Sequence, residues 1–527
     1  MTSRLTIIVL FVLIVTGWQG ASAQEPNSAS PANYSQEAVV IEHFSTKLQF
    51  QNDGTAQKET TMRARVQSDA GVQQMGLLRY LYLEANETPE VVYVRLRKPD
   101  GTVVITPPES IQDQPSEVTR LAPFYSDLRE KHIAVKGLSA GDVLEYQYRS
   151  HTHTPLIPGQ FWLADDFIRD GIVLDQELEV SVPVDRMVKV KSTEIQPTVR
   201  EEGNRRIYLW KSTNLKRKTE EEKAADESQS ESPPPAVQLS TFESWEEVGR
   251  WYDSLQRDRI EPTPEIQAKA AELTKGAASD EDKLRAIYSY VALKFRYIGI
   301  SFGVGRYQPH PAADVLANQY GDCKDKHTLL AALLKAAGLM AYPALINSSR
   351  QIDPKVPSPA QFDHVISAIP QADGYLWLDT TPEVAPFALL LFTLRDKQAL
   401  VISEGKPALL VKTPQDPPFP TTARFQVEGK LDESGTLTAK IERTFRGDME
   451  VLLRAAFRGT PQAQWKDLIQ NISYASGFAG TVSKIDVSAP EATDAPFRLS
   501  YDYNRKEYPD WANHRISMPA RPTACQP

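Results

Sequence analysis

The sequence predicts a multidomain protein: an antiparallel β-sandwich over residues 37–212, an α+β core over residues 237–412 and a short β-rich domain over residues 413–527. Runs of β-branched and aromatic residues, separated by turn residues, fill the first and last of these regions. Apolar residues at helical spacing, followed by short β-like runs, fill the middle region, an order typical of α+β domains. A chain of 527 residues is long enough for three domains.

The N-terminus has the pattern of a secretory signal peptide over residues 1–23. Its parts are a positive charge, a short apolar segment and a small-residue cleavage site: Arg4, residues 7–15, and Ala21 with Ala23. We therefore expect an exported chain, periplasmic or extracellular, with a polar linker over residues 24–36. An uncleaved membrane anchor is the alternative, although a bilayer span needs about 20 apolar residues. No later segment has the composition of a transmembrane helix.

The β-sandwich is predicted from strand-like runs with turn signals between them. The runs are residues 80–83, 91–96, 144–148, 173–182 and 206–210. The turn signals are Asn52-Asp53-Gly54, Pro99-Asp100-Gly101 and Ala140-Gly141-Asp142. A charged, proline-rich segment follows at residues 213–236. Its composition is typical of a solvated linker, with a functional charged arm as the alternative.

The central domain is predicted to contain helices followed by an antiparallel sheet. Apolar spacing indicates a helix near residues 245–255, and Ser279 with Asp282 resembles a capping box that opens a second helix. A third helix is expected over residues 324–337, ended by Gly338. Short strands are expected at residues 295–298, 342–346, 365–369 and 375–378.

A proline-rich joint, residues 414–420, leads into the last domain. We expect a hairpin, a helix and a further strand, at residues 425–431 with 436–445, 465–472 and 497–503. The polar, proline-rich end of the chain suggests a domain that is incomplete or irregular there.

Charge and cysteine content exclude some functions. The chain has 59 basic and 68 acidic residues, a net charge of −9, which argues against a nucleic-acid binder. Two cysteines do not form a disulfide framework. A single bridge between Cys323 and Cys525 is an alternative that would silence the Cys323 thiol. Otherwise a free thiol in an exported chain is either buried or chemically used.

Cys323 is the strongest candidate for a nucleophile. It lies in Tyr320-Gly321-Asp322-Cys323-Lys324-Asp325-Lys326, at the expected start of the third helix. A helix N-terminus carries unpaired N–H groups and partial positive charge, which favour a thiolate and offer donors to an oxyanion. Asp322 and Asp325 oppose the thiolate, and the neighbouring lysines offset them.

A histidine and an aspartate follow in the order that a nucleophile's base and orienting group require. His364 and Asp379 flank the expected hairpin. If Ile369 pairs with Gly374, they stand directly opposite, with Cβ atoms about 4.5–5.5 Å apart. Each residue alone has a structural alternative: a buried thiol, a strand histidine and a turn aspartate.

Other histidines are weaker candidates. His327 lies one helical turn after Cys323, but no carboxylate is placed to orient it. His310 is expected in a loop beside the cleft. His151 and His153 alternate on one strand and lack a third metal ligand, so we expect no metal site and no cofactor.

These motifs resemble the transglutaminase-like superfamily. The resemblance runs from about Asp282 to Thr381, and its most specific part is the Gly-Asp-Cys-Lys-Asp helix start. The order of domains resembles a bacterial exported type in which a β-rich domain of unknown function precedes the transglutaminase-like core. The resemblance implies a papain-like fold whose catalytic cysteine, histidine and aspartate match Cys323, His364 and Asp379.

The resemblance also implies an acyl-enzyme thioester, as in crosslinkers, peptidases and amide hydrolases. Crosslinkers often carry glutamine or an aromatic residue before the nucleophile, where this chain has Asp322. The resemblance leaves the second oxyanion donor unassigned; Gln308 is the candidate, with Gln319 as runner-up. We expect a protein or peptide substrate. The alternative is a catalytically quiet cell-envelope binding or scaffold protein that retains the triad.

Overall fold

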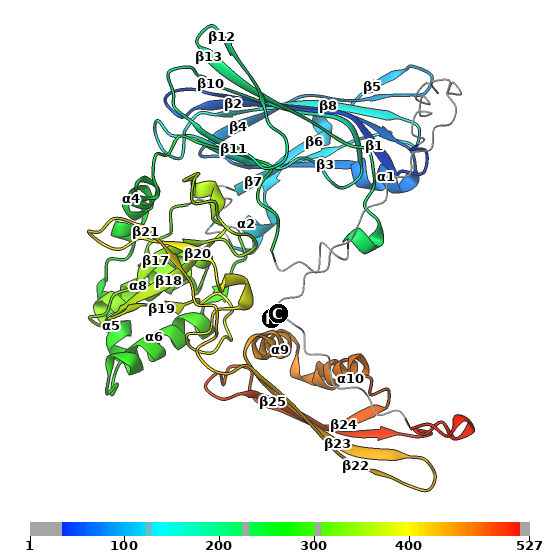
Figure 1. Ribbon diagram of the computed structural model, residues 1–527, viewed down its shortest axis with the longest axis vertical. Coiled ribbons are helices and arrows are strands. Elements are labelled where there is room, and N and C mark those ends of the chain that lie inside the picture. Colours follow the sequence, from blue (N-terminus) through cyan, green and yellow to red (C-terminus); the bar gives the residue numbers. More distant parts are fainter. Residues whose placement is uncertain (1–33, 123–124, 126–127, 224–230, 301–306, 517–527) are drawn as a thin grey trace, which may run out of the picture.

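The computed structural model describes residues 34–122, 125, 128–223, 231–300 and 307–516. Three regions follow one another along its long axis (Figure 1). The N-terminal β domain lies at one end, the helix-covered central domain in the middle and the C-terminal domain at the other end. The predicted signal peptide, most of the following linker and Cys525 lie outside the described residues.

An eight-stranded sheet forms the main layer of the N-terminal domain, in the order β12-β13-β10-β1-β2-β8-β4-β5. Its strands are β1 (Val39–Phe50), β2 (Ala56–Val66), β4 (Glu87–Arg97), β5 (Val103–Ile105), β8 (Val143–Thr152), β10 (Ile172–Pro183), β12 (Thr198–Glu202) and β13 (Arg205–Asn214). The five predicted runs all lie in strands. The sheet is antiparallel as predicted except at one pair, since β1 and β10 run parallel. Parallel strands need a long crossover, which alternation in the sequence does not reveal.

Two smaller sheets complete the domain, in the orders β3-β7-β6 and β11-β14-β9. Their bounds are β3 (Leu77–Leu83), β6 (Ile111–Pro115), β7 (Leu128–Ala134), β9 (Trp162–Asp165), β11 (Lys189–Ser192) and β14 (Val237–Ser240). Strand β14 lies after the predicted linker, yet it pairs with β9 and β11. Its Val237 and Leu239 are buried with Trp210 in this domain's core. The N-terminal domain therefore takes a strand from the segment assigned to the core. Two short helices, α1 (Asp69–Met75) and α2 (Glu117–Leu121), connect its strands.

The central domain packs helices on a five-stranded antiparallel sheet, β19-β18-β17-β20-β21. The helices are α4 (Trp245–Gln256), α5 (Pro264–Leu273), α6 (Asp280–Lys294), α7 (Ala312–Asn318) and α8 (Cys323–Ala336). The strands are β17 (Tyr342–Ile346), β18 (His364–Gln371), β19 (Gly374–Leu378), β20 (Gln398–Val401) and β21 (Leu409–Lys412), and β15 (Arg296–Tyr297) pairs with β16 (Tyr320–Gly321). All predicted elements of this domain are present.

Helix α8 is the central element of this domain's core. It is surrounded by α5, α6 and α7, and its residues Cys323 through Leu334 are all buried. Burial on every side explains why its apolar residues do not form a single stripe. The helix that carries Cys323 is therefore held on all faces.

The C-terminal domain has a four-stranded antiparallel sheet, β22-β23-β25-β24, and two helices. Its elements are β22 (Thr422–Leu431), β23 (Leu437–Arg446), α9 (Asp448–Gly459), α10 (Trp465–Ala475), β24 (Thr481–Val487) and β25 (Phe497–Arg505). The sequence did not predict α9, whose buried face carries the ion pair Glu450–Arg454 beside the apolar residues Val451 and Phe457.

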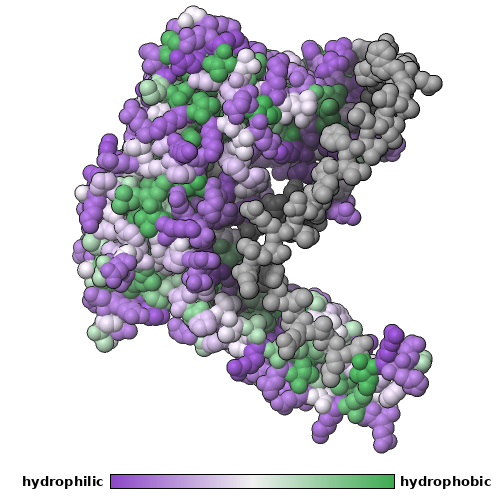
Figure 2. All heavy atoms as spheres, viewed as in Figure 1, coloured by the Kyte–Doolittle hydropathy of each residue, from purple (hydrophilic) through white to green (hydrophobic). Residues whose placement is uncertain are grey.

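The surface is mostly hydrophilic in the view of Figure 2, and apolar side chains gather over the central domain. Within the described part of the chain, no helix combines the length and apolar composition needed to cross a bilayer.

Candidate active site

Cys323 is the first residue of α8, as predicted. Asp322 precedes it as the N-cap and accepts a hydrogen bond from the N–H of Asp325 at 3.2 Å. Gly321 leaves room for this turn, since a Cβ there would lie 2.7 Å from the Cβ of Asp325. Cys323 is a free thiol and is 1% exposed. The sulfur thus lies beside the positive end of a buried helix dipole.

His364 and Asp379 lie together on the sheet that faces α8. His364 Nε2 is 3.1 Å from Asp379 Oδ2, and both side chains are buried. The predicted register was nevertheless wrong. Ile369 pairs with Leu376, and Gln371 with Gly374, so Asp379 continues the hairpin diagonally from His364 rather than directly opposite. The register differs by two residues, which keeps both side chains on one face within reach of each other.

The charges of this pair stabilise each other. Burial disfavours the imidazolium, but the charge and hydrogen bond of Asp379 and the contact with Cys323 outweigh it and hold the pKa of His364 well above its usual value. Burial likewise opposes the charged form of Asp379, and His364 outweighs it, so the pKa of Asp379 is lowered. Thr381 assists, because its N–H and Oγ1 donate to Asp379 Oδ1 at 2.9 and 2.8 Å.

Cys323 lies close enough to the same imidazole to help raise its pKa. Since Nε2 faces the carboxylate, Nδ1 is the nitrogen left for the thiol. The three side chains therefore form one chain of contacts from α8 to β18 to the end of β19. An imidazolium placed between a carboxylate and a sulfur favours the thiolate, which is the nucleophilic form.

The charged residues around Cys323 are neutralised within the helix start. Lys324 pairs with Asp322, and both are buried. Burial and the neighbouring Asp325 raise the pKa of Asp322 to about 6, against the pull of Lys324. Burial opposes ionisation of Asp325, but His310 and Lys324 lower its pKa to about 2. Lys326 points away, donates to the carbonyls of Ala292 and Phe295, and has its pKa lowered by burial to about 8.

The competing histidines have other partners. His327 is buried, its Nδ1 lies 2.7 Å from Ser367 Oγ, and burial lowers its pKa to about 3, so it is neutral. His310 Nδ1 lies 3.1 Å from Asp325 Oδ2. His151 and His153 are exposed, with ring centroids 6.4 Å apart. Among the described residues, no group of three potential metal ligands gathers.

The two oxyanion candidates differ in position. Gln308 is half-buried and follows Tyr307, which packs in the same apolar cluster as Cys323. Gln319 is exposed at the C-terminal end of α7, in the left-handed conformation with φ of 58°. Gln308 is therefore the better placed of the two.

The N-terminal domain contributes to the surroundings of Cys323, which the sequence did not predict. Trp162 of β9 packs against Phe242, Trp251 and Tyr307, with ring centroids 5.8, 6.1 and 6.1 Å away. Phe242 and Tyr307 belong to the apolar cluster that includes Cys323. Tyr125 reaches the start of α8 itself. These contacts join residues that lie 80 or more positions apart in the sequence, and no local sequence signal marks them.

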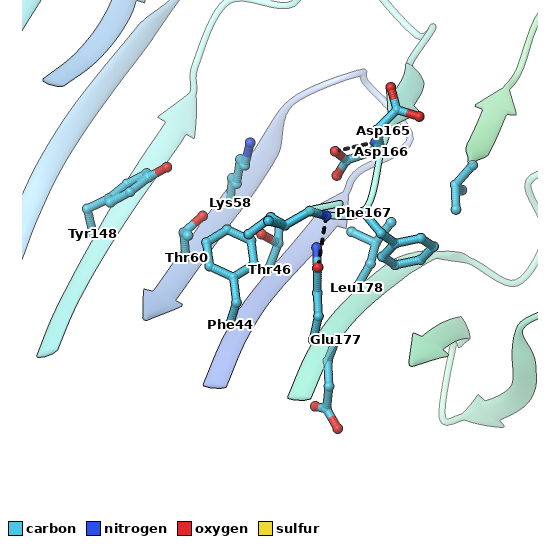
Figure 3. Close-up of a pocket in the computed structure, with 13 residues that line it drawn as sticks. Phe44, Thr46, Lys58, Thr60, Tyr148, Asp165, Asp166, Phe167, Glu177 and Leu178 are labelled. Carbon is cyan, nitrogen blue, oxygen red and sulfur yellow. Dashed lines mark hydrogen bonds between the residues drawn. The ribbon is translucent and has the colours of Figure 1, made fainter. Parts of the chain in front are cut away.

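A separate cavity lies in the N-terminal domain (Figure 3). It has a volume of about 180 Å³ and is lined by both polar and apolar residues, among them Phe44, Lys58, Thr60, Tyr148, Asp165 and Phe167. Burial raises the pKa of Asp165, against the charge of Lys58. The Thr60 hydroxyl is buried and has no hydrogen-bond partner among the described residues. Neither Cys323 nor His364 lines this cavity, so it is distinct from the nucleophile site.

Two family models match the chain. A domain of unknown function with a solved structure (DUF3857) matches residues 52–219, and the transglutaminase-like superfamily matches residues 267–367. The second match includes Cys323 and His364, and Asp379 lies just beyond its end. The chain therefore carries a DUF3857 domain followed by a transglutaminase-like core, the architecture that the motifs predicted. No curated protein matches the chain.

A solved structure shares the fold over most of the chain. A crystal structure of a putative protease from Parabacteroides distasonis is 13% identical, with a TM-score of 0.59 over 89% of this chain and 93% of that chain. At that identity the likeness shows the fold alone. A putative cysteine protease from Cytophaga hutchinsonii (11% identity, 63% of this chain and 77% of that chain) has a TM-score of 0.19. An M1 zinc metallopeptidase from Deinococcus radiodurans (11%, 39% and 42%) has a TM-score of 0.21. The TM-scores of these two structures are too low to indicate a shared fold.

Proposed function

We propose that this protein is an exported cysteine enzyme that transfers the acyl group of a carboxamide or peptide bond through a thioester on Cys323. The observation that carries the proposal is the buried His364–Asp379 pair, with 3.1 Å between His364 Nε2 and Asp379 Oδ2, beside the helix start that holds Cys323. The transglutaminase-like match supports the class, and the Parabacteroides distasonis neighbour is described as a putative protease. The signal-peptide pattern of residues 1–23 supports export.

The chemistry follows from the positions of these groups. The Cys323 thiolate attacks the carbonyl carbon, and the His364 imidazolium gives its proton to the departing nitrogen as the C–N bond breaks. The neutral imidazole then takes a proton from water or an amine, which attacks the thioester and releases the sulfur. The Cys323 N–H, in the first turn of α8, has no intrahelical acceptor and can donate to the oxyanion, with Gln308 as the side-chain candidate.

The test compares the full chain with Cys323→Ala and His364→Ala on a mixture of synthetic peptides. Mass spectrometry detects cleaved peptides, and a fluorescent primary amine detects acyl transfer to glutamine-containing peptides. We expect products from the native chain alone, and the two readouts distinguish water from an amine as the acceptor. Products that persist in Cys323→Ala would contradict the proposal.

A scaffold function is the second candidate, and the burial of Cys323 under the aromatic cluster favours it. A scaffold needs no reactive thiol. Iodoacetamide should then label Cys323 in the folded chain at the same rate in His364→Ala as in the native chain. An enzyme should show slower labelling in His364→Ala at pH 6.

A further inference from the structure

A tyrosine of the N-terminal domain reaches the start of the nucleophile helix. Tyr125 lies between α2 and β7 and is 2% exposed. Its hydroxyl oxygen accepts the N–H of Asp322 at 2.6 Å and donates to Asp325 Oδ2 at 2.7 Å. Asp322 and Asp325 flank the first turn of α8, so a residue of the DUF3857 domain is bonded to the turn that carries Cys323.

The Tyr125 side chain is fixed by its packing. It packs in a small apolar cluster with Ile298 and Ile300 of the central domain. Its ring lies edge-on to His310, with centroids 5.4 Å apart. On the N-terminal side, Thr119 Oγ1 donates to the carbonyl of Tyr125 at 2.7 Å. Both ends of the contact are therefore held in place.

The charges make the hydroxyl a donor. Burial and the negative charges of Asp322 and Asp325 raise the pKa of Tyr125 far above its usual value, so it keeps its proton. The backbone N–H of His310 donates to the other oxygen, Asp325 Oδ1, at 2.8 Å, and its ring Nδ1 lies 3.1 Å from Oδ2. The carboxylate of Asp325 is thus held by one residue from each domain, Tyr125 and His310. Asp325 also packs closely against Gly321, and its N–H donates to the side chain of Asp322 at 3.2 Å, so it is joined to the backbone just before Cys323.

We propose that Tyr125 is a positioning residue, and that through it the DUF3857 domain holds the first turn of α8 so that Cys323 meets His364. The inference rests on the proposed function of Cys323. The DUF3857 domain thereby takes part in the active site. Without Tyr125, only the central domain would hold the first turn of α8 in place.

The experiment measures iodoacetamide alkylation of Cys323 in the full chain at pH 6 and pH 9. Tyr125→Phe keeps the ring but removes the hydroxyl, leaving Asp322 N–H without its acceptor and Asp325 without one donor. We expect alkylation about tenfold slower at pH 6, the scale of one lost hydrogen bond to a charged group. At pH 9 the rates should converge, because free thiols, with a pKa of about 8.5, deprotonate there without a histidine.

Tyr82→Phe is the matched control. Its hydroxyl is buried in the same domain and lies 2.7 Å from Asp113 Oδ2, but it does not touch α8. Alkylation in this variant should equal that of the native chain at both pH values. Native-like alkylation in Tyr125→Phe at pH 6 would overturn the inference.

Faster alkylation at both pH values would also overturn it, since loss of a mere cover would expose the thiol at every pH. His364→Ala, measured in parallel, separates the two proposals. If His364→Ala is slowed and Tyr125→Phe is not, only the role of Tyr125 fails. If His364→Ala is not slowed, the proposed function fails and the role of Tyr125 fails with it.

Discussion

Replacing Asp379 by asparagine tests the hydrogen bond that orients His364. The substitution keeps the shape of the side chain and removes its charge, at a group 3.1 Å from His364 Nε2. The two side chains are 10% and 3% exposed, so solvent screens the pair little. A buried hydrogen bond between charged groups contributes about 1.5–3 kcal/mol. Loss of that amount corresponds to a rate lowered roughly 10- to 150-fold.

The assay is the alkylation rate of Cys323 by iodoacetamide at pH 6, followed on the tryptic peptide of residues 307–324. That peptide separates Cys323 from Cys525. Asparagine has nearly the size of aspartate, so we expect Cys323 to be equally buried in both proteins and access to cancel in the ratio of rates. In the variant, burial still lowers the pKa of His364, but the negative charge of Asp379 that opposes this effect is gone. The pKa of His364 therefore falls, and fewer molecules hold the imidazolium that stabilises the thiolate.

Asp363→Asn is the matched control for this substitution. Asp363 precedes His364 and carries the same charge, but it accepts hydrogen bonds from Ser348 N–H and Oγ at 2.7 and 3.0 Å. We expect the alkylation rate of Asp363→Asn to stay within about threefold of the native rate, since a partly exposed charge that is not bonded to His364 contributes less than about 1 kcal/mol. Rates in Asp379→Asn within twofold of native at pH 6 would refute the reasoning.

Three further predictions concern pH and backbone. The pKa of His364 is raised, so its protonation stabilises the fold fully below the unfolded pKa of about 6.5, and this stabilisation is lost as pH rises through the folded pKa. The difference in melting temperature between the native chain and His364→Gln should therefore shrink toward alkaline pH. A difference that does not change with pH would contradict this. The pKa of His327 is lowered by burial to about 3, so stability should fall by about 1.4 kcal/mol per pH unit below pH 6.5; acid titration of His327→Leu should lack that slope. Gly321→Ala places a Cβ 2.7 Å from Asp325 Cβ and should slow alkylation of Cys323 at pH 6 about tenfold or more, whereas native alkylation would show that the turn adapts.

The sequence predicted the local elements of the site well and the hairpin register poorly. Residues 364–379 carry the strand pattern, and the buried face is set by alternation. The alternation does not determine the length of the turn between the two strands. Pro370 was assigned to the turn, whereas the structure keeps it in β18 opposite Tyr375. Gly374, with φ of 121°, permits the tighter two-residue turn. The His364–Asp379 contact survived because the shift preserves the face.

Contacts between the domains could not be predicted from the sequence. The sequence around Tyr125 and Trp162 looks like that of an ordinary β domain. Their partners lie on segments that only the tertiary fold brings near. Thr381 had a weak local signal, since a threonine two residues after an aspartate can donate back to its carboxylate. Buried charges were also invisible: the sequence gives Lys324 and Lys326 equal charge, but one pairs with Asp322 and the other with backbone carbonyls.

The placement of β14 also determines how the chain can be divided and how it folds. Val237 and Leu239 are fully buried in the N-terminal domain, and Ser244 already caps α4 of the next domain. A fragment that stops at residue 219 would lack β14, so the apolar core residues that β14 covers would be exposed. We expect such a fragment to aggregate. Because β14 lies between β9 and β11, we expect this sheet to stay incomplete during synthesis until residue 240 has emerged. An expressed N-terminal domain should therefore extend to residue 240.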